Sequence, residues 1–354
     1  MWATHLQWWC SLFIPGTWDT RRRFTLWSIG VVMIAVTANI SHAQSALTVL
    51  GKDYTFPNKV EGLPAKLSDF PGLRINFFVT SDGVKLTYWD AGTGKPLIFL
   101  PGWSSNGAEY INVMYLLSQH YHVYVLDPRN QGLSQLVDYG NRIARFATDF
   151  KEFVDYLGLK SFDVCGHSMG ASVLWSYIDQ YGSGAIHKAA FVDEPISITS
   201  RPWWTEDEKK QYGVLASNPA DLVEFGEQFL MPPTSEPNKE GSPKLSNAGQ
   251  STPAFENSVG FASQVIKNDP SYMLKVLYDH AANDWHDVIL QKIHMPVVIF
   301  SGDISPNLAS QKWAHSVLKG STLYVFSKEE GGDHLLMFRN PAKFANDLRE
   351  FLVQ

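Results

Sequence analysis

Residues Gly166–Gly170 read G-H-S-M-G, a pentapeptide whose residue types can do nucleophilic chemistry. They fit the G-x-S-x-G pattern, in which a serine stands on a sharp turn between a strand and a helix. An apolar run, Phe162–Cys165, precedes the pentapeptide, and a segment suited to a helix, Met169–Gln180, follows it. Glycines two residues before and after Ser168 leave room for a strained turn in which side chains would collide. The pattern predicts Ser168 as a nucleophile at the carboxyl edge of a sheet, facing the start of a helix.

A serine hydroxyl becomes a good nucleophile only when a base takes its proton, so a histidine is required. His334 fits best, because the glycine-bearing loop Glu330–His334 follows the last expected strand and precedes the closing helix. This position puts His334 at the same sheet edge as Ser168. Other histidines fit worse. His167 should point away from the neighbouring hydroxyl, His120 and His122 bracket a strand start, and His280, His286 and His294 lie before the strand at Pro296.

Hydrolysis of an acyl group also requires hydrogen-bond donors for the oxygen that becomes negatively charged. The amide of Met169 is one candidate, because it directly follows the nucleophile. The loop Pro101–Ser105 follows an apolar strand, and Gly102 lets its backbone turn inward. The Trp103 amide is therefore the second candidate, although Gly and Ser are common in any strand-to-helix turn.

Short apolar runs alternate with amphipathic segments along the chain, which predicts a mostly parallel sheet with helices on both faces. Ser81–Gly83 marks the turn of an antiparallel hairpin. We expect eight strands, over Arg74–Thr80, Val84–Asp90, Pro96–Leu100, His122–Leu126, Phe162–Cys165, Lys188–Val192, Pro296–Phe300 and Thr322–Phe326. We expect helices over Glu109–Gln119, Asn141–Leu157, Met169–Gln180, Gln311–Leu318 and Pro341–Leu352.

The alternation stops after Glu194, where prolines stand among polar and aromatic residues. We interpret residues 195–285 as a helical cap inserted after the sixth strand, between core segments 73–194 and 286–354. Residues 44–72 read as a linker. The cap offers apolar side chains that more often pack than bind substrate, and we assign none as a ligand: Trp203, Trp204, Phe225, Phe229, Met231, Phe255, Phe261 and Met273.

Composition excludes several classes of function. Of 354 residues, 45% are hydrophobic, which is enough for a large core. The net charge of −6 argues against a nucleic-acid binder. Only Cys10 and Cys165 are present, so neither a disulfide scaffold nor a zinc–thiolate cluster is possible. No histidine spacing demands a metal, and we expect no cofactor.

The first 43 residues resemble an export signal. Arg21–Arg23 form a basic region, Phe24–Ile40 is an uncharged apolar run, and Ser41–Ala43 has small residues at both cleavage positions. We expect a signal peptide over 1–43, cleavage after Ala43, and a periplasmic or secreted protein without stable membrane association. Thr20–Phe24 also resembles a twin-arginine signal. The alternative is an uncleaved anchor, although the run is shorter than the ~20 residues a spanning helix needs.

Over residues 73–354 the chain resembles the α/β-hydrolase-fold superfamily, and within it the capped serine hydrolases of the esterase, lactonase and haloperoxidase branch. Leu100–Trp103 resembles the family's oxyanion loop, and Gly166–Gly170 its elbow. Asp127–Ser134 resembles its D-x-R-G-x-G-x-S turn, with Asn130 in place of the first glycine. Asp333-His334 resembles its histidine loop. Relatives with an aspartate nucleophile, the haloalkane dehalogenases and epoxide hydrolases, differ at Ser168.

The third member of the triad departs from the common family pattern. In most relatives the acid lies three residues after the glycine that ends the strand expected over Pro296–Phe300. Counted from Gly302, that position is Ser305 here. Asp303 is nearer the strand end. The preceding strand ends in Asp193-Glu194-Pro195, which is similar to the arrangement in haloalkane dehalogenases and a zearalenone-hydrolysing lactonase. This resemblance selects Asp193 as the acid, with Asp303 and Glu194 as alternatives.

These residues imply a serine hydrolase that cleaves a moderately apolar small-molecule ester or lactone through an acyl-enzyme on Ser168. Ser168, His334 and Asp193 would be catalytic, and the Trp103 and Met169 amides would form the oxyanion hole. Two alternatives share the fold: an enzyme for perhydrolysis or carbon–carbon bond hydrolysis, and a receptor-like binding protein. Product analysis would distinguish the alternative enzymes from an esterase. Labelling of Ser168 without turnover would indicate the receptor-like protein.

Overall fold

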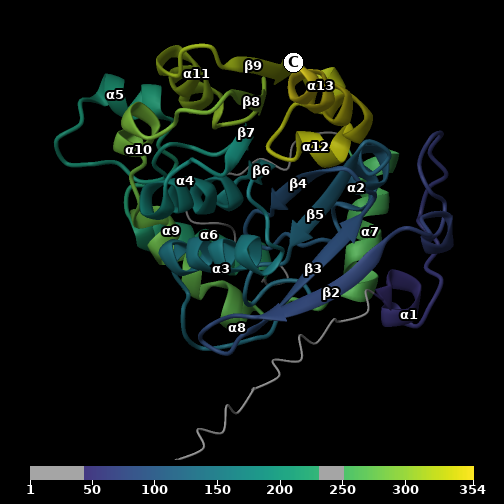
Figure 1. The fold of residues 1–354 in the computed structure, drawn as a ribbon. Helices are drawn as coiled ribbons and strands as arrows, with labels where there is room; N and C mark the ends of the chain where they lie inside the picture. Colours follow the sequence, from purple (N-terminus) through teal and green to yellow (C-terminus); the bar gives the residue numbers. More distant parts are fainter. Residues whose placement is uncertain (1–43, 231–250) are drawn as a thin grey trace, which may run out of the picture. The chain divides into compact units, whose positions relative to one another are not determined.

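The computed structural model describes residues 44–230 and 251–354. The expected leader over 1–43 and Met231 lie outside the described residues. The described strands form one sheet in the order β1-β2-β3-β5-β4-β6-β7-β8-β9 (Figure 1). They are β1 (Gln44–Ser45), β2 (Arg74–Val79), β3 (Lys85–Ala91), β4 (Lys95–Leu100), β5 (Tyr121–Leu126), β6 (Phe162–His167), β7 (Ile186–Val192), β8 (Val297–Gly302) and β9 (Thr322–Phe326).

The pairing of the strands confirms the expected fold class. β1, β2, β3 and β5 pair antiparallel, and β5, β4, β6, β7, β8 and β9 pair parallel. All eight expected strands are present. The short β1 is an addition that the sequence did not indicate, because two residues carry no periodicity. The sheet therefore has nine described strands instead of eight.

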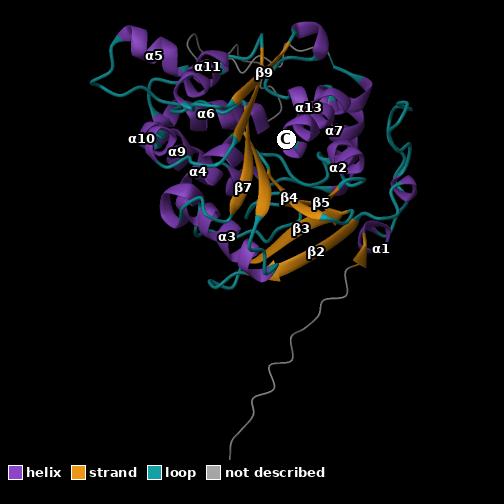
Figure 2. Ribbon diagram, turned by 45° about the horizontal axis from the view of Figure 1, so that its top comes forward, coloured by secondary structure: helices purple, strands orange, loops and turns teal. Residues whose placement is uncertain are grey.

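The sheet is buried on both faces, which explains why its central strands are apolar without alternation. In β4, Leu97 and Phe99 pack on one face while Ile98 and Leu100 pack on the other. Figure 2 shows the strands between two groups of helices. The helices outside the insert are α1 (Ala46–Leu50), α2 (Ile111–Leu117), α3 (Ile143–Tyr156), α4 (Met169–Tyr181), α11 (Leu308–Val317), α12 (Leu336–Arg339) and α13 (Pro341–Val353), with 3₁₀ turns η1 (Leu67–Asp69) and η2 (Lys328–Glu330).

A helical insert separates β7 from β8, and its last helix, α10, lies beyond the range 195–285 interpreted as a cap. Its described helices are α5 (Glu206–Tyr212), α6 (Pro219–Leu230), α7 (Pro253–Val265), α8 (Pro270–Met273), α9 (Lys275–Ala282) and α10 (His286–Gln291). They do not form one layer. α6 packs on α9, whereas α7 packs beside α2 and α12. Among the helices of the described residues, none is both long and apolar enough to cross a membrane.

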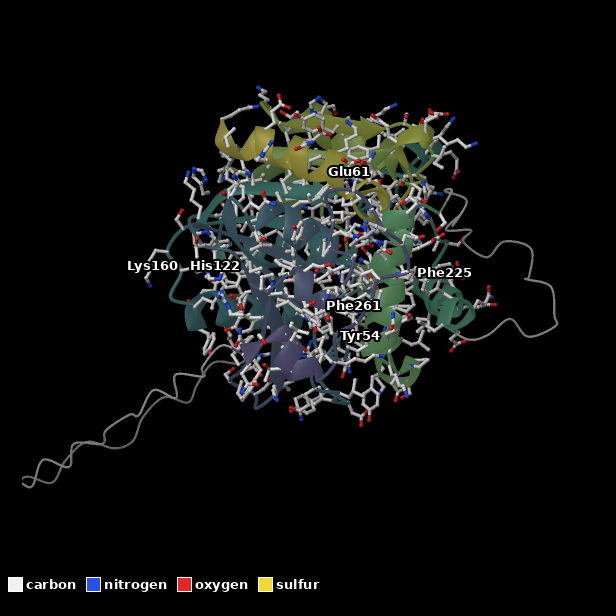
Figure 3. The ribbon with its side chains drawn as sticks, turned by 90° about the vertical axis from the view of Figure 1, so that its right-hand side faces the viewer. Tyr54, Glu61, His122, Lys160, Phe225 and Phe261 are labelled. Carbon is white, nitrogen blue, oxygen red and sulfur yellow. The ribbon has the colours of Figure 1, made fainter. Side chains whose placement is uncertain are left out.

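Residues 44–72, interpreted as a linker, are packed against the core. Phe56 and Leu67 are 4% and 1% exposed. The ring of Phe261, on α7, contacts the rings of Tyr54 and Phe56 with centroids 5.7 and 5.2 Å apart. Figure 3 shows Tyr54 beside Phe261, with Phe225 on another helix. The linker interpretation is wrong because this segment, which lacks periodicity, is ordered by apolar contacts with residues far away in the chain, and local sequence does not reveal such contacts.

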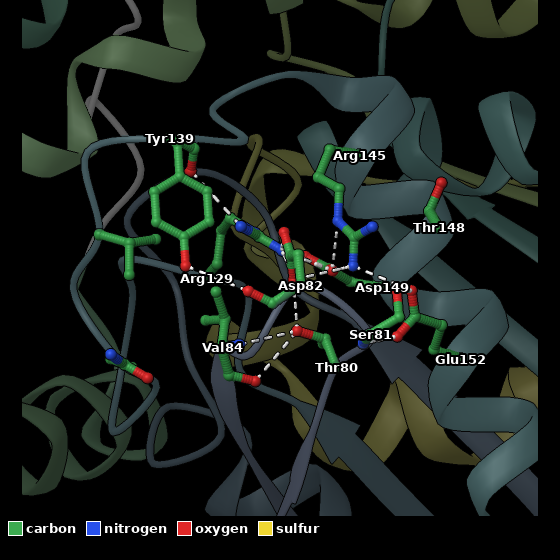
Figure 4. A network of polar contacts seen from close by, with 12 residues as sticks. Thr80, Ser81, Asp82, Val84, Arg129, Tyr139, Arg145, Thr148, Asp149 and Glu152 are labelled. Atoms are coloured by element: carbon green, nitrogen blue, oxygen red, sulfur yellow. Dashed lines mark hydrogen bonds and ion pairs between the residues drawn. The ribbon is translucent and has the colours of Figure 1, made fainter.

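A buried charge network fastens α3 to the β2–β3 turn (Figure 4). Arg129 is fully buried, and its guanidinium donates to both Asp149 oxygens and to Asp82. Arg145 joins the network through Asp82, Asp149 and Glu152. A buried guanidinium without such partners would be costly. The network therefore fixes the start of the segment that leads from β5 into α3.

Candidate active site

Ser168 stands between the end of β6 and the start of α4, with a φ of 51° and a ψ of −133°. Residues other than glycine rarely adopt this backbone conformation, so the turn is strained. Each flanking glycine is required for a different steric reason. A Cβ on Gly166 would lie 2.7 Å from the Gly170 oxygen, and a Cβ on Gly170 would lie 1.9 Å from the Leu100 oxygen. The two glycines therefore let the elbow close on itself and lie against the end of β4.

His334 lies in the loop between η2 and α12, next to the serine. The Ser168 Oγ is 3.0 Å from the His334 Nε2, and the His334 Nδ1 is 2.7 Å from the Asp193 Oδ2. With Nδ1 protonated, the imidazole donates to the aspartate and accepts from the serine. The structure thus brings Ser168, His334 and Asp193 into one hydrogen-bonded chain.

Asp193 follows β7 and is completely buried, with a φ of 51°. Its carboxylate also accepts hydrogen bonds from the hydroxyls of Ser301 and Ser305, at 2.5 and 2.6 Å, and from the Asn307 amide at 3.2 Å. Neutral donors of this kind hold a buried carboxylate in place without competing with the histidine's charge. Sequence reasoning did not single out Ser301 or Asn307. Ser301 lies near the carboxyl end of β8 and Asn307 lies shortly after that strand, so a search for polar residues at this strand end could have found them.

The two alternative acids lie elsewhere. The side chain of Asp303 is exposed, and its backbone amide donates to the Phe326 oxygen. Glu194 is buried, but its Oε1 accepts from Ser172 and from the Nε2 of His280. Neither carboxylate has a hydrogen bond to His334 among the described residues.

The charges of the site shift its pKa values in opposite directions. Burial would lower the pKa of His334, but the hydrogen bond and charge of Asp193 outweigh burial and raise that pKa above its ordinary value. Burial would raise the pKa of Asp193, but His334, Ser301 and Ser305 together hold it below its ordinary value. The aspartate is therefore ionised whenever the histidine needs a partner for its positive charge.

His167 contributes to the position of the base. Its Nε2 donates to the backbone oxygen of His334 at 2.9 Å, and the two rings lie 5.0 Å apart. Burial lowers the pKa of His167 to about 3, so its imidazole is neutral at ordinary pH. As expected, His167 does not reach the Ser168 hydroxyl; it holds the loop that carries His334.

The loop between β4 and α2, residues 101–110, lies against the elbow. A Cβ on Gly102 would be only 3.0 Å from the Ser168 Cβ. No acceptor within residues 44–230 and 251–354 takes the backbone N–H of Trp103 or of Met169. The Trp103 indole N–H donates to the Met273 oxygen at 2.9 Å and so ties this loop to α8. Two unpaired amides beside the serine are available to an oxyanion.

The segment Asp127–Ser134 holds the same loop in place through hydrogen bonds to Asp127. Buried Asp127 accepts hydrogen bonds from the Gly107 amide, the Leu133 amide and the Trp89 indole, at 2.6, 2.9 and 3.2 Å. Asn130, which stands where the family pattern has glycine, has a φ of 67°. Asparagine tolerates this left-handed conformation better than other side chains, so the replacement preserves the turn.

A cavity of about 580 Å³ opens beside Ser168 and His334. Of the apolar cap residues singled out, Phe225, Phe229 and Phe255 line it. The remaining described ones do not: Trp203 is 75% exposed, Phe261 and Met273 are buried, and Trp204 packs on Tyr212. Polar residues that sequence reasoning missed also line the cavity, namely Ser105, Asn106, Glu109, Asn268 and Arg339. Within the described ranges, no three His, Cys, Asp or Glu side chains gather as metal ligands.

Comparison with known proteins identifies the family. A model of the alpha/beta hydrolase fold matches residues 95–328. A non-heme haloperoxidase of Rhodococcus erythropolis is 31% identical over 117 residues, which span 33% of this chain and 43% of that protein. A non-heme chloroperoxidase of Kitasatospora aureofaciens is 26% identical over 77% of this chain and 98% of its own length. The solved structure of an esterase from Exiguobacterium antarcticum has a TM-score of 0.59 at 21% identity, over 79% of this chain and 99% of that one. The chain belongs to the alpha/beta hydrolase fold family.

Proposed function

We propose that the protein is a serine hydrolase that cleaves a carboxylic ester or lactone of a moderately apolar small molecule. The observation that carries this proposal is the hydrogen-bonded chain from Ser168 through His334 to Asp193, which ends at a cavity of about 580 Å³. A cavity of this size suits a small organic molecule. The aromatic residues on α6 and α7 give it apolar surface.

The mechanism assigns one role to each group. The Ser168 Oγ attacks the acyl carbonyl while the His334 Nε2 takes its proton, and the amides of Trp103 and Met169 donate to the oxyanion. Asp193 holds the imidazole in the required tautomer and stabilises its cation. His334 then gives the proton to the leaving oxygen, which breaks the ester bond. Water, activated by His334, releases the acid from Ser168.

The test is covalent labelling followed by turnover. We expect a fluorophosphonate probe to label the protein at Ser168, and Ser168→Ala to remain unlabelled. Steady release of nitrophenol from nitrophenyl esters of varied chain length would then support hydrolysis. Absence of label on the folded wild type would contradict the enzymatic proposal, and label without turnover would indicate a receptor-like protein.

The similarity to proteins named as haloperoxidases favours one second candidate, a perhydrolase. In that reaction hydrogen peroxide replaces water in the attack on the acyl-enzyme, and the product is a peracid. The two candidates share every residue of the site, so only products separate them. Peracid formation from an ester and peroxide, at a rate above that of hydrolysis, would favour perhydrolysis. Carbon–carbon bond hydrolysis is tested in the same way, with a diketone as substrate.

We also propose that the protein is exported and that a signal peptidase cleaves it after Ala43. The basic Arg21–Arg23 followed by an apolar run and small residues supports this proposal. When the protein is isolated from a cell that exports it, N-terminal sequencing should show a mature chain that begins at Gln44. A membrane-bound, uncleaved chain would instead support the anchor.

A further inference from the structure

The geometry points to a polar subsite around Glu109 that binds a primary ammonium group of the substrate. This inference rests on the proposed function and narrows its substrate class. The ester would carry an apolar chain with an ammonium group away from the reacting carbonyl. Glu109 would then be a residue that determines specificity without taking part in the chemistry at Ser168.

Hydrogen bonds link Glu109 to the loop that lies beside the nucleophile. The Ser105 amide donates to the Gly102 oxygen at 3.2 Å, which closes a turn. In such a turn the first and last Cα atoms are less than about 7 Å apart. The Ser105 hydroxyl then donates to the Glu109 Oε2 at 2.6 Å. Gly102 lies against Ser168, and Glu109 and Ser168 line the same cavity.

The carboxyl group of Glu109 has room for a further partner. It lines the cavity, and its Oε1 accepts no hydrogen bond from the described residues. No lysine, arginine or histidine among those residues pairs with it. Burial raises the pKa of Glu109 to about 7, and the nearby charge of Asp127 adds to that effect while Ser105 opposes it. A desolvated carboxylate without a counter-ion gains most from a ligand that brings a positive charge.

Among the described residues, the other carboxylate and guanidinium side chains that line the cavity pair with each other. Asp333 and Arg339 line it too, but the Arg339 Nε donates to the Asp333 Oδ2 at 2.5 Å. The same guanidinium lies over the Phe255 ring, 4.3 Å from its centroid. Asp333 thus has a basic partner, whereas Glu109 lines the cavity without one among the described residues. Phe225 and Phe229 on α6 give it apolar surface for the chain that links the two ends of the substrate.

Two nitrophenyl esters of equal length test the subsite, one with an acyl chain that ends in a primary ammonium and one with a methyl group in its place. At pH 8 we expect the wild type to prefer the ammonium ester by about tenfold or more in kcat/KM, as one charge-assisted hydrogen bond implies. Glu109→Gln should bring the ratio close to one. Glu109→Asp keeps the charge and should keep part of the preference. Glu329→Gln removes an exposed carboxylate and should change nothing.

The outcomes separate this inference from the proposed function. Equal turnover of both esters by the wild type, or an unchanged ratio in Glu109→Gln, would overturn the subsite and leave the hydrolase proposal intact. If the wild type turns over neither ester, calorimetry with the matching alkyl amides gives the same comparison by binding. Tighter binding of the ammonium amide, lost in Glu109→Gln, would support the subsite even then, and equal binding would overturn it.

Discussion

Asp193 and Glu194 are consecutive carboxylates at the end of β7, and their surroundings look alike. They are 0% and 2% exposed. Each accepts from a histidine nitrogen at 2.7 Å, from His334 and His280 respectively, and each accepts from at least one serine hydroxyl. His334 lies in the loop before α12 and His280 lies on α9, so the two pairs face different parts of the molecule.

The difference lies in the second nitrogen of each histidine. The Nε2 of His334 reaches the Ser168 Oγ at the cavity. The Nδ1 of His280 is buried and has no hydrogen-bond partner among the described residues. Glu194 instead joins His280 on α9 to Ser172 on α4, and so ties the insert to the core. A buried histidine–carboxylate pair therefore indicates catalysis only when the histidine also faces a hydroxyl beside a cavity.

The largest expected effect breaks the first pair. Asp193→Asn should lower kcat/KM for a nitrophenyl ester by about 10⁴, because the amide favours the wrong tautomer of His334 and leaves its cation unpaired. Circular dichroism should show a folded protein. Asp303→Asn is the matched control, because that side chain is exposed. Full activity in Asp193→Asn together with a large loss in Asp303→Asn would reverse the assignment.

The second pair should respond in stability more than in rate. Glu194→Gln weakens two buried hydrogen bonds to a charged group, so we expect about 2 kcal/mol less free energy of unfolding. The kcat/KM should stay within about tenfold of the wild type. Denaturant unfolding measures the first quantity and ester turnover the second, with Glu329→Gln as an exposed control. A loss of activity as large as that of Asp193→Asn would remove the distinction between the two pairs.

A third change moves the acid to the position where most relatives carry it. The Ser305 Oγ lies 2.6 Å from the Asp193 Oδ2, the oxygen that binds His334. Asp193→Asn combined with Ser305→Asp should therefore recover about tenfold of the lost kcat/KM, and full recovery is not expected because small misplacements cost much rate. Ser305→Asp alone should lower activity, since two carboxylates would meet. If the double variant is no better than Asp193→Asn, Ser305 is not a second location for the acid.

The sequence predicts the parts of this site that depend on local pattern. The elbow around Ser168 and the loop of His334 follow from glycine spacing and from the ends of strands. The choice between Asp193 and Glu194 needed a resemblance, because both follow the same strand and only packing against β8 and α9 tells them apart. Glu109 and Asn307 escaped prediction for a similar reason: each lies just before a helix, and its role depends on residues far away in the chain.

The smallest expected effect is a shift in the pH dependence. His334 must be neutral to take the serine's proton, so kcat/KM is lost as pH falls through its pKa, which Asp193 holds above the ordinary value for histidine. Asp193 contributes most to that increase, and the charge of Glu194 contributes less. The midpoint of the acid limb should therefore be highest in the wild type, lower in Glu194→Gln and lowest in Asp193→Asn, where the residual rate is still measurable. If the midpoint in Asp193→Asn lay at or above the wild-type value, a group other than His334 would control the loss of kcat/KM at low pH. The two carboxylates would then differ less in their effect on the site than their contacts indicate.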